Sequence, residues 1–225
     1  MPAPQNIPMS SRAAPTPENF ILLALSGLTL IASGIQPVDR LTWVMEIFPI
    51  LIIAPLLTLT AARFPLTPVL YRLIFLHTLV LMLGGHYTYA QTPVGFWLQD
   101  ILHLDRNPYD RIGHLFQGFV PAIAAREILL RRTDLRRGAM LSFLAVSVCL
   151  AFSAFYELIE WWSALALGQG ADAFLGTQGD PWDTQWDMFC ALIGALLALI
   201  FLAGLHDRQL RQLAQKDADP TSLRH

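Results

Sequence analysis

Residues 187–205 read DMFCALIGALLALIFLAGL, and this stretch decides the fold because it carries no charge after its first residue. A helix needs roughly 20 predominantly apolar residues to cross the hydrocarbon core of a bilayer. Lipid offers no hydrogen-bond partners to an exposed backbone, so open β-structure cannot span it. The stretch therefore predicts a transmembrane helix.

Five further apolar stretches precede this one. The six predicted spans are residues 20–36, 41–62, 68–86, 113–130, 139–167 and 187–205. The composition agrees, because 54% of the 225 residues are hydrophobic and only 14% are charged, which is too apolar for a typical soluble domain of this length. The sequence predicts an all-α, polytopic membrane protein built as a six-transmembrane-helix bundle.

The remaining segments divide the chain into three parts. Residues 1–18 are expected to be a disordered cytoplasmic N-terminus. The apolar stretch that follows lacks a convincing cleavage site, so it is interpreted as a retained span and not as a removed signal peptide. Residues 19–206 form the predicted transmembrane domain, with an outer loop at 87–112 and an acidic outer loop at 168–186. Residues 207–225 are predicted to be a cytoplasmic tail.

The distribution of positive charge predicts the orientation. With the N-terminus inside, twelve of the 15 Lys and Arg residues fall on inner segments, and only Arg40, Arg106 and Arg111 fall outside. Loops on the cytoplasmic side are enriched in Lys and Arg. Both termini are therefore predicted to lie in the cytoplasm, with the turn at 131–137 (RRTDLRR) as the main anchor.

Charge and cysteine content exclude other classes of protein. The net charge of −2 and the absence of a basic stripe with interleaved aromatic residues argue against nucleic-acid binding. Membrane lipid is the expected partner, while the substrate and the oligomeric state are not predicted. Cys149 and Cys190 lie in apolar runs at different depths and are expected to be free thiols.

The acidic residues show the opposite bias from the basic ones, since eleven of the 17 lie on or near the outer side. Acidic residues contribute little to topology. Their clustering therefore indicates either a solvated outer rim or a functional site. Three segments contribute to it.

The first segment leads into the fourth span. If a helix begins near Tyr109, then Asp110, His114 and Gln117 occupy positions i, i+4 and i+7 and share one face. A carboxylate, an imidazole and an amide in that arrangement can bind a metal or relay a proton. Alternatively, Asp110 favours the positive end of the helix dipole and His114 hydrogen-bonds across the bundle.

The second segment is the outer end of the fifth span, where Glu157 and Glu160 are three residues apart on one helix face. Two carboxylates near hydrocarbon must be protonated, paired with a cation or bound to a metal, since an isolated charge there costs about 2.5 kcal/mol or more. Alternatively, the span ends earlier, both acids reach the headgroups, and Trp161 and Trp162 form an interfacial belt.

The third segment is the start of the sixth span, where Asp183 and Asp187 are four residues apart and can face one side together. Asp183 is equally well explained as the N-cap of the last helix, with Asp187 favoured by the helix dipole. Asp180 lies in the turn-rich loop just before them.

Together these segments predict one polar cluster on the outer face. Its predicted metal ligands are Asp110, His114, Glu157, Glu160, Asp183 and Asp187; its catalytic candidates are Glu157, Glu160 and His114; its secondary candidates are His86, Gln117, Asp180 and Glu46. Oxygen ligands with one or two imidazoles suit Mg²⁺, Mn²⁺, Ca²⁺ or Zn²⁺. The cofactor expected is thus a divalent metal ion, although no HExxH, GxSxG, P-loop or CxxC motif is present.

Four motifs of these segments also carry a family resemblance. They are residues 86–89 (HYTY), residues 107–114 (NPYDRIGH) with Gln117 and Gly118, Glu157 with residues 160–161 (EW), and residues 179–188 (GDPWDTQWDM). With them the chain resembles the YjdF family of bacterial inner-membrane proteins. The resemblance implies a location in the bacterial inner membrane and does not imply any particular reaction.

A looser similarity relates the chain to VanZ-like membrane proteins. It rests on the helix start from Asp110 to His114, on Glu157 or Glu160 in the next span, and on Asp183 or Asp187 before a last span rich in small residues. The chain departs from the VanZ-like pattern at Glu160, where those proteins have an amide. This similarity implies work on the cell envelope or on lipid-linked compounds.

Three functions remain open from the sequence. The first is a metal-dependent hydrolase or transferase acting on an envelope or lipid substrate, with one carboxylate as general base. The second is an ion- or proton-coupled transporter, although neither an internal repeat nor paired broken helices are visible. The third is a non-catalytic scaffold.

Arg126 and Glu127, near the inner end of the fourth span, are predicted to form a local ion pair.

Overall fold

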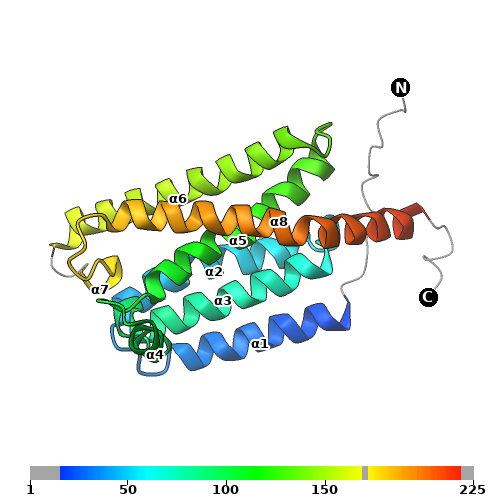
Figure 1. Ribbon diagram of the computed structural model, residues 1–225. Helices are drawn as coiled ribbons and strands as arrows, with labels where there is room; N and C mark the ends of the chain where they lie inside the picture. Colours follow the sequence, from blue (N-terminus) through cyan, green and yellow to red (C-terminus); the bar gives the residue numbers. More distant parts are fainter. Residues whose placement is uncertain (1–15, 169–171, 219–225) are drawn as a thin grey trace.

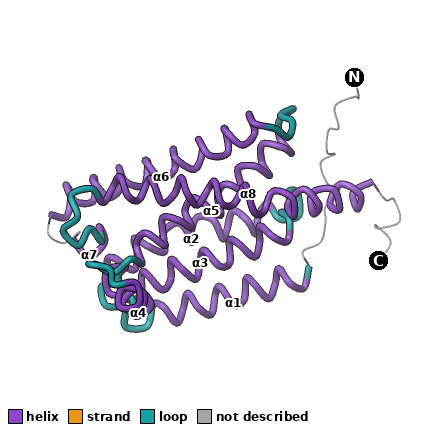
Figure 2. Tube along the Cα trace, in the orientation of Figure 1, coloured by secondary structure: helices purple, strands orange, loops and turns teal. Residues whose placement is uncertain are grey.

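The computed structural model describes residues 16–168 and 172–218 of the chain, and within these ranges all regular structure is helical (Figure 2). The helices are α1 (Pro17–Ser33), α2 (Arg40–Thr60), α3 (Pro68–Tyr87), the 3₁₀ turn η1 (Tyr89–Gln91), α4 (Pro93–Leu102), α5 (Tyr109–Arg132), α6 (Ala139–Leu167), α7 (Asp172–Leu175) and α8 (Asp183–Ala218). The predicted all-α fold is confirmed. Each predicted span coincides with one of the long helices α1, α2, α3, α5, α6 and α8.

Length and composition qualify four of these helices as membrane spans among the described residues: α2, α3, α6 and α8. Helix α1 is apolar but has only 17 residues. Helix α5 is long enough at 24 residues, but it buries charged side chains near both of its ends. The prediction of a helical membrane protein is confirmed, while the count of six spans stays a prediction.

Two helix boundaries differ from those predicted by hydropathy. Helix α5 begins at Tyr109 rather than Gly113, because the Asn107 side chain accepts a hydrogen bond from the Tyr109 N–H at 3.1 Å and so satisfies one donor of the first turn. Helix α8 begins at Asp183 and continues past the predicted end at Leu205 as far as Ala218. Just past Leu205, His206 and Asp207 contact Arg126 of α5, an interaction that hydropathy does not detect.

The long helices lie side by side in antiparallel order (Figure 1). Helices α4 and α7 lie at one end of the bundle, and the start of α1 and the end of α8 lie at the other. Helix α5 occupies the centre, in contact with α3, α6 and α8. Segments that are distant in the sequence therefore meet at the end that carries α4 and α7.

Helices α5 and α8 approach each other closely at two glycines. A Cβ at Gly118 would collide with the carbonyl oxygen of Ala191, and a Cβ at Gly194 would collide with that of Leu115. Small residues allow membrane helices to bring their backbones together in this way. The contact fixes His114 and Asp187, which are about one turn from Gly118 and Ala191, on facing helices.

The outward faces of the bundle are apolar. Large hydrophobic side chains such as Leu59, Phe143 and Ile200 are 79%, 65% and 71% exposed. A soluble protein rarely exposes contiguous apolar surface of this kind, whereas lipid solvates it. Cys149 is buried in the core and Cys190 is partly buried, and both are free thiols as predicted.

Candidate metal centre

Helices α5, α6 and α8 bring an imidazole and several carboxylates together at the α4 and α7 end of the bundle. The His114 Nε2 atom lies 3.6 Å from Asp110 Oδ1 and 3.8 Å from Asp187 Oδ2. The His114 Nδ1 atom lies 3.9 Å from Glu157 Oε1. Together with Glu160, these residues form what we call the carboxylate–histidine cluster.

The helix faces explain why these side chains point inward. On α6 the buried positions include Ala145, Cys149, Ser153, Glu157 and Glu160, which follow one stripe of a 3.6-residue helix. Helix α6 continues past both glutamates to Leu167, and both glutamates face the interior of the bundle. Trp161 and Trp162, on the outward side, are exposed.

All five members of the cluster are buried: the exposed fractions are 6% for Asp110, 5% for His114, 8% for Glu157, 7% for Glu160 and 1% for Asp187. Two overlapping groups have donor atoms within 4.8 Å of one another, namely Asp110, His114 and Asp187, and His114, Glu157 and Glu160. Ligands bound to one ion at about 2.0–2.6 Å lie no more than about 5 Å apart. Either group is therefore compact enough for a single divalent ion.

Several oxygens of the cluster have no hydrogen-bond partner. In the described part of the chain, Asp110 Oδ2, Glu157 Oε1 and Asp187 Oδ1 are buried and unpartnered. Buried polar atoms in folded proteins almost always have a partner, and an exception indicates a bound ion, water or a functional role. These oxygens therefore have unused capacity to bind a cation.

The contact between His114 and Gln117 favours one of the two groups. The His114 Nδ1 atom lies 3.0 Å from Gln117 Oε1, a carbonyl oxygen that accepts a hydrogen bond. With the proton on Nδ1, the lone pair of Nε2 faces Asp110 and Asp187. Histidine ligands are commonly oriented by such a second contact, so Asp110, His114 and Asp187 are the better ligand set.

Two arginines next to the cluster contact the loop before α8 and the first residue of α8. Arg106 Nη1 lies 2.7 Å from Asp183 Oδ1 and donates to the Thr177 carbonyl oxygen at 2.8 Å. Arg111 Nη2 lies 3.1 Å from Asp180 Oδ2. We call Arg106, Arg111, Asp180 and Asp183 the arginine layer. Asp183, a predicted ligand, stands outside both ligand groups because its carboxylate is paired with Arg106.

The secondary candidates Glu46 and His86 lie on α2 and α3. Glu46 is 3% exposed, and its Oε2 accepts a hydrogen bond from the Tyr156 hydroxyl at 3.5 Å. The Tyr156 ring lies 6.1 Å from that of His114, so Glu46 reaches the cluster through this tyrosine. His86 Nδ1 instead lies 2.9 Å from the Ser33 carbonyl oxygen and links α3 to α1.

The other end of the bundle holds a second buried polar network, here called the distal network: Thr67, Arg126, Glu127, Arg131, His206 and Asp207. The predicted pair of Arg126 with Glu127 is wrong, because adjacent residues point in different directions around a helix. Arg126 Nη2 lies 2.8 Å from Asp207 Oδ1, while Glu127 Oε1 lies 2.8 Å from Arg131 Nη1. His206 Nε2 lies 3.0 Å from Glu127 Oε2.

The two networks differ in how well their atoms are paired. In residues 16–168 and 172–218, none of the buried side-chain atoms without a partner belongs to the distal network, whereas five of them belong to Asp110, Glu157, Asp187 and Arg106. Both networks are buried and both use α5. Burial of charged groups therefore does not by itself leave atoms unpaired in this fold. The unpaired charged atoms lie at the end of the bundle that holds the carboxylate–histidine cluster.

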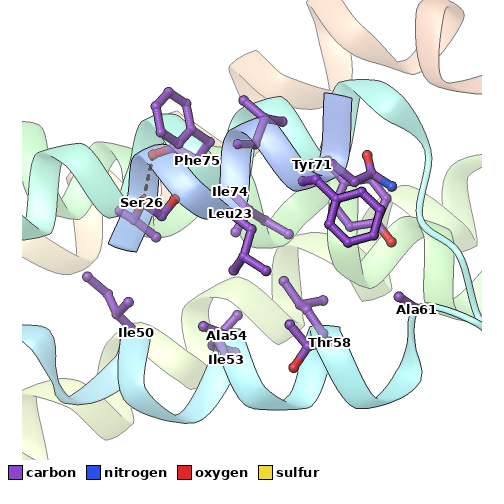
Figure 3. A pocket seen from close by; sticks show the side chains of 15 residues that line it. Leu23, Ser26, Ile50, Ile53, Ala54, Thr58, Ala61, Tyr71, Ile74 and Phe75 are labelled. Carbon is purple, nitrogen blue, oxygen red and sulfur yellow. Dashed lines mark hydrogen bonds between the residues drawn. The ribbon is translucent and has the colours of Figure 1, made fainter. Parts of the chain in front are cut away.

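A pocket of about 210 Å³ lies elsewhere, between α1, α2 and α3 (Figure 3). Its walls include Leu23, Ile53 and Ile74. Neither a carboxylate nor an imidazole is among the 15 residues that line it. The groups with acid–base or ligand chemistry are therefore not in this pocket.

The architecture and the cluster are those of a helical membrane protein, and comparison with known proteins agrees. The chain belongs to a family described as predicted membrane proteins, DUF2238, whose profile matches residues 19–208. It is 61% identical over 196 residues, covering 85% of this chain and 94% of the relative, to the inner membrane protein YjdF of Escherichia coli strain K12. No solved structure matches the chain significantly.

These matches confirm the resemblance to the YjdF family. With several helices able to cross a membrane, the chain is a multi-pass protein of the bacterial inner membrane. The looser similarity to VanZ-like proteins is not shown by these comparisons.

Proposed function

We propose that this protein is a membrane-embedded, metal-dependent hydrolase or transferase that acts on an envelope or lipid substrate. In this proposal the chain crosses the membrane six times with both termini in the cytoplasm. The carboxylate–histidine cluster then lies at the outer end of the bundle and holds a divalent metal ion.

The positions of basic residues support this orientation. The cluster end carries Arg106 and Arg111, whose charges are engaged by the aspartates of the arginine layer. The opposite end carries Arg126, Arg131 and Arg137 together with further Lys and Arg, as expected for a cytoplasmic side. Helix α1, with 17 residues, reaches about 25 Å, close to the roughly 30 Å of hydrocarbon.

The observation that carries the proposal is the charge around His114. Arg106 and Arg111 already pair with Asp183 and Asp180. Four buried carboxylates surround a single imidazole: Asp110, Glu157, Glu160 and Asp187. Asp110 Oδ2 also lies 3.7 Å from Arg106 Nη2, so the two arginines and one imidazole face more carboxylates than they can neutralise. Isolated charges in a low-dielectric interior are costly unless they are paired or coordinate a metal. A divalent cation would compensate this excess of negative charge and bind the unpartnered oxygens.

The arrangement also supports hydrolysis or group transfer. A cation held by Asp110, His114 and Asp187 would polarise a substrate oxygen or lower the pKa of a bound water. Glu157 faces the other side of the imidazole, 3.9 Å from its Nδ1 atom. Glu157 or Glu160 would take the proton from the attacking water or hydroxyl as general base.

Metal analysis of detergent-purified protein tests the proposal. We expect the wild-type protein to retain or take up one divalent ion per chain and the Glu157→Gln/Asp187→Asn double variant to lose it. Asp207→Asn, at the opposite end, is the matched control and should keep the metal. Elemental analysis gives the retained ion, and Mn²⁺ titration followed by electron paramagnetic resonance gives the occupancy. A folded wild-type protein that binds none of Mg²⁺, Mn²⁺, Ca²⁺ and Zn²⁺ would contradict the proposal.

A further inference from the structure

We infer that the substrate carries a phosphoryl group, which is bound by the Nε–Nη2 edge of Arg106 and the Nε atom of Arg111 beside the metal ligands. This inference rests on the proposed function and specifies the substrate class of the same site. The phosphoryl group belongs either to a lipid headgroup or to a soluble phosphate ester. Both present the same tetrahedral oxyanion to the two guanidinium groups.

Arg106 is held by one nitrogen and free along one edge. Its Nη1 atom donates to Thr177 and Asp183, at 2.8 and 2.7 Å. Its Nε and Nη2 atoms are buried and have no hydrogen-bond partner. These two atoms form the edge of a guanidinium group that binds two oxygens of one phosphate side by side.

The free edge faces the ligand group. Arg106 Nη2 lies 3.7 Å from Asp110 Oδ2, which is itself a buried oxygen without a hydrogen-bond partner. This separation is too long for a hydrogen bond. An oxyanion at the Arg106 edge would therefore be adjacent to an ion bound by Asp110, and one phosphate could bridge the two.

Arg111, in the first turn of α5, contributes a second donor. Its Nε atom is buried and unpartnered, while its Nη2 atom contacts Asp180 at 3.1 Å. Its guanidinium group lies over the Trp186 ring, 4.9 Å from the centroid. Asp180 contacts both arginines, so both side chains are oriented before any ligand binds.

The distal network provides a comparison within the same chain. Arg126 and Arg131 are also buried, but in the described residues neither has a buried nitrogen without a partner. An unpaired buried donor costs about 1–3 kcal/mol, more when it is charged. Unused donors on Arg106 and Arg111 together therefore point to a ligand that supplies acceptor oxygens.

The proposed metal ion favours phosphate over other oxyanions as the ligand of these arginines. Hard divalent ions held by one or two carboxylates commonly complete their coordination with oxygens of a substrate phosphate. Gly176, with φ +64°, borders Asp110, and a Cβ there would lie 3.6 Å from the Asp110 Cγ atom. Because this loop residue has no side chain, none extends from it over the carboxylate where the oxyanion would bind.

Phosphate binding beside the metal can be measured directly. Detergent-purified protein is loaded with Mn²⁺, occupancy is read by electron paramagnetic resonance, and inorganic phosphate is added as the probe. Phosphate next to bound Mn²⁺ should show paramagnetic broadening of its ³¹P signal. Equilibrium dialysis with labelled phosphate, with and without Mn²⁺, measures binding independently of the metal.

Arg106→Lys is the decisive variant, because lysine keeps the charge that pairs with Asp183 but lacks the two-nitrogen edge. We expect unchanged Mn²⁺ occupancy and at least a tenfold loss of phosphate affinity, and a smaller loss for Arg111→Lys. Arg137→Lys, at the opposite end, should match the wild type. Competition by a short-chain phosphatidic acid distinguishes the two sources: stronger displacement than by glycerol phosphate indicates a lipid headgroup, and equal displacement a soluble ester.

The outcomes separate this inference from the proposed function. If Mn²⁺ binds but phosphate is neither broadened nor retained, or if Arg106→Lys binds phosphate like the wild type, the phosphoryl inference is overturned and the metal site stands. If none of Mn²⁺, Mg²⁺, Ca²⁺ and Zn²⁺ binds, the proposed function fails. Arg106-dependent retention of phosphate in metal-free dialysis would then still support the arginine site, and its absence would overturn it.

Discussion

His114 Nδ1 lies 3.0 Å from Gln117 Oε1, one turn further along α5, and this contact orients the imidazole with Nε2 toward Asp110 and Asp187. An amide oxygen accepts a hydrogen bond, so this contact favours the neutral tautomer with its proton on Nδ1. The lone pair of Nε2 is then directed toward Asp110 and Asp187, at 3.6 and 3.8 Å. Gln117 is thus a positioning residue for the metal ligand.

Replacing Gln117 with alanine should weaken metal binding without removing any ligand. Loss of a contact that orients a metal-bound histidine typically costs about 10- to 100-fold in affinity. We expect a loss in that range for Gln117→Ala in Mn²⁺ titrations. Gln185→Ala, an exposed glutamine at the start of α8, is the control. Equal affinities of the two variants would show that Gln117 does not orient His114.

The close contact of α5 with α8 should be intolerant of a single methyl group. In Gly118→Ala the new Cβ meets the carbonyl oxygen of Ala191, a backbone atom that cannot rotate away. Such overpacking costs about 1–3 kcal/mol. We expect a lower thermal midpoint in detergent, together with weaker metal binding, because His114 and Asp187 are about one turn from this contact.

The control for Gly118→Ala is Gly204→Ala, because Gly204 also lies within a helix but has no heavy atom within 4 Å of its Cβ position. Alanine is favoured over glycine in helices by about 1 kcal/mol, so this variant should be unchanged or more stable. A loss of stability at Gly204 as large as that at Gly118 would rule out the packing explanation.

The distal network should contribute to stability and not to metal binding. Arg126 Nη1 donates to His206 Nδ1 at 2.7 Å, so the His206 Nε2–H donates to Glu127 Oε2 at 3.0 Å. Glu127 also accepts from Thr67 and Arg131. Removing one partner of a buried ion pair costs about 3–5 kcal/mol, so Glu127→Ala should lower the thermal midpoint strongly.

Metal occupancy separates stability from binding in this variant. Folded Glu127→Ala, stabilised at low temperature, should still bind Mn²⁺ with wild-type affinity. A selective loss of Mn²⁺ binding in folded protein would show that the two ends of α5 are coupled.

Local sequence spacing was sufficient to predict part of the site. The face formed by Asp110, His114 and Gln117 follows from helical periodicity once α5 begins at Tyr109. The inward position of Glu157 and Glu160 follows from their three-residue spacing in an apolar helix. Here the relevant geometry lies within single helices, which the sequence specifies directly.

Contacts between distant segments could not be predicted in the same way. Arg106 lies in a loop before α5, and its partner Asp183 is 77 positions away. Nothing in the local sequence distinguishes this arginine from a basic residue that only influences the orientation of the chain in the membrane. The same holds for Glu46 and Tyr156, which are 110 positions apart. These partners depend on how the helices pack, and the unpartnered atoms of Arg106 are visible only after that packing is known.

Replacing Glu157 should have the opposite effect on stability from replacing Glu127. Glu157 is buried with an unpartnered oxygen, and its carboxylate lies within 4.8 Å of that of Glu160, so in metal-free protein burial and a like charge both oppose its negative charge. Glutamine has the same shape without the charge. Glu157→Gln should therefore be at least as stable as the wild type when both are stripped of metal by chelation.

Bound metal should reverse this order of stability between Glu157→Gln and the wild type. A ligand that binds only the folded state stabilises it by an amount that grows with the logarithm of its affinity. The Glu157 carboxylate places negative charge beside the ion, so saturating Mn²⁺ should raise the thermal midpoint of the wild type more than that of Glu157→Gln. Thermal unfolding of both proteins with chelator and with Mn²⁺ gives the four values needed. A metal-free Glu157→Gln variant that is much less stable than the metal-free wild type would mean that Glu157 is a structural residue, paired in the fold in the manner of Glu127.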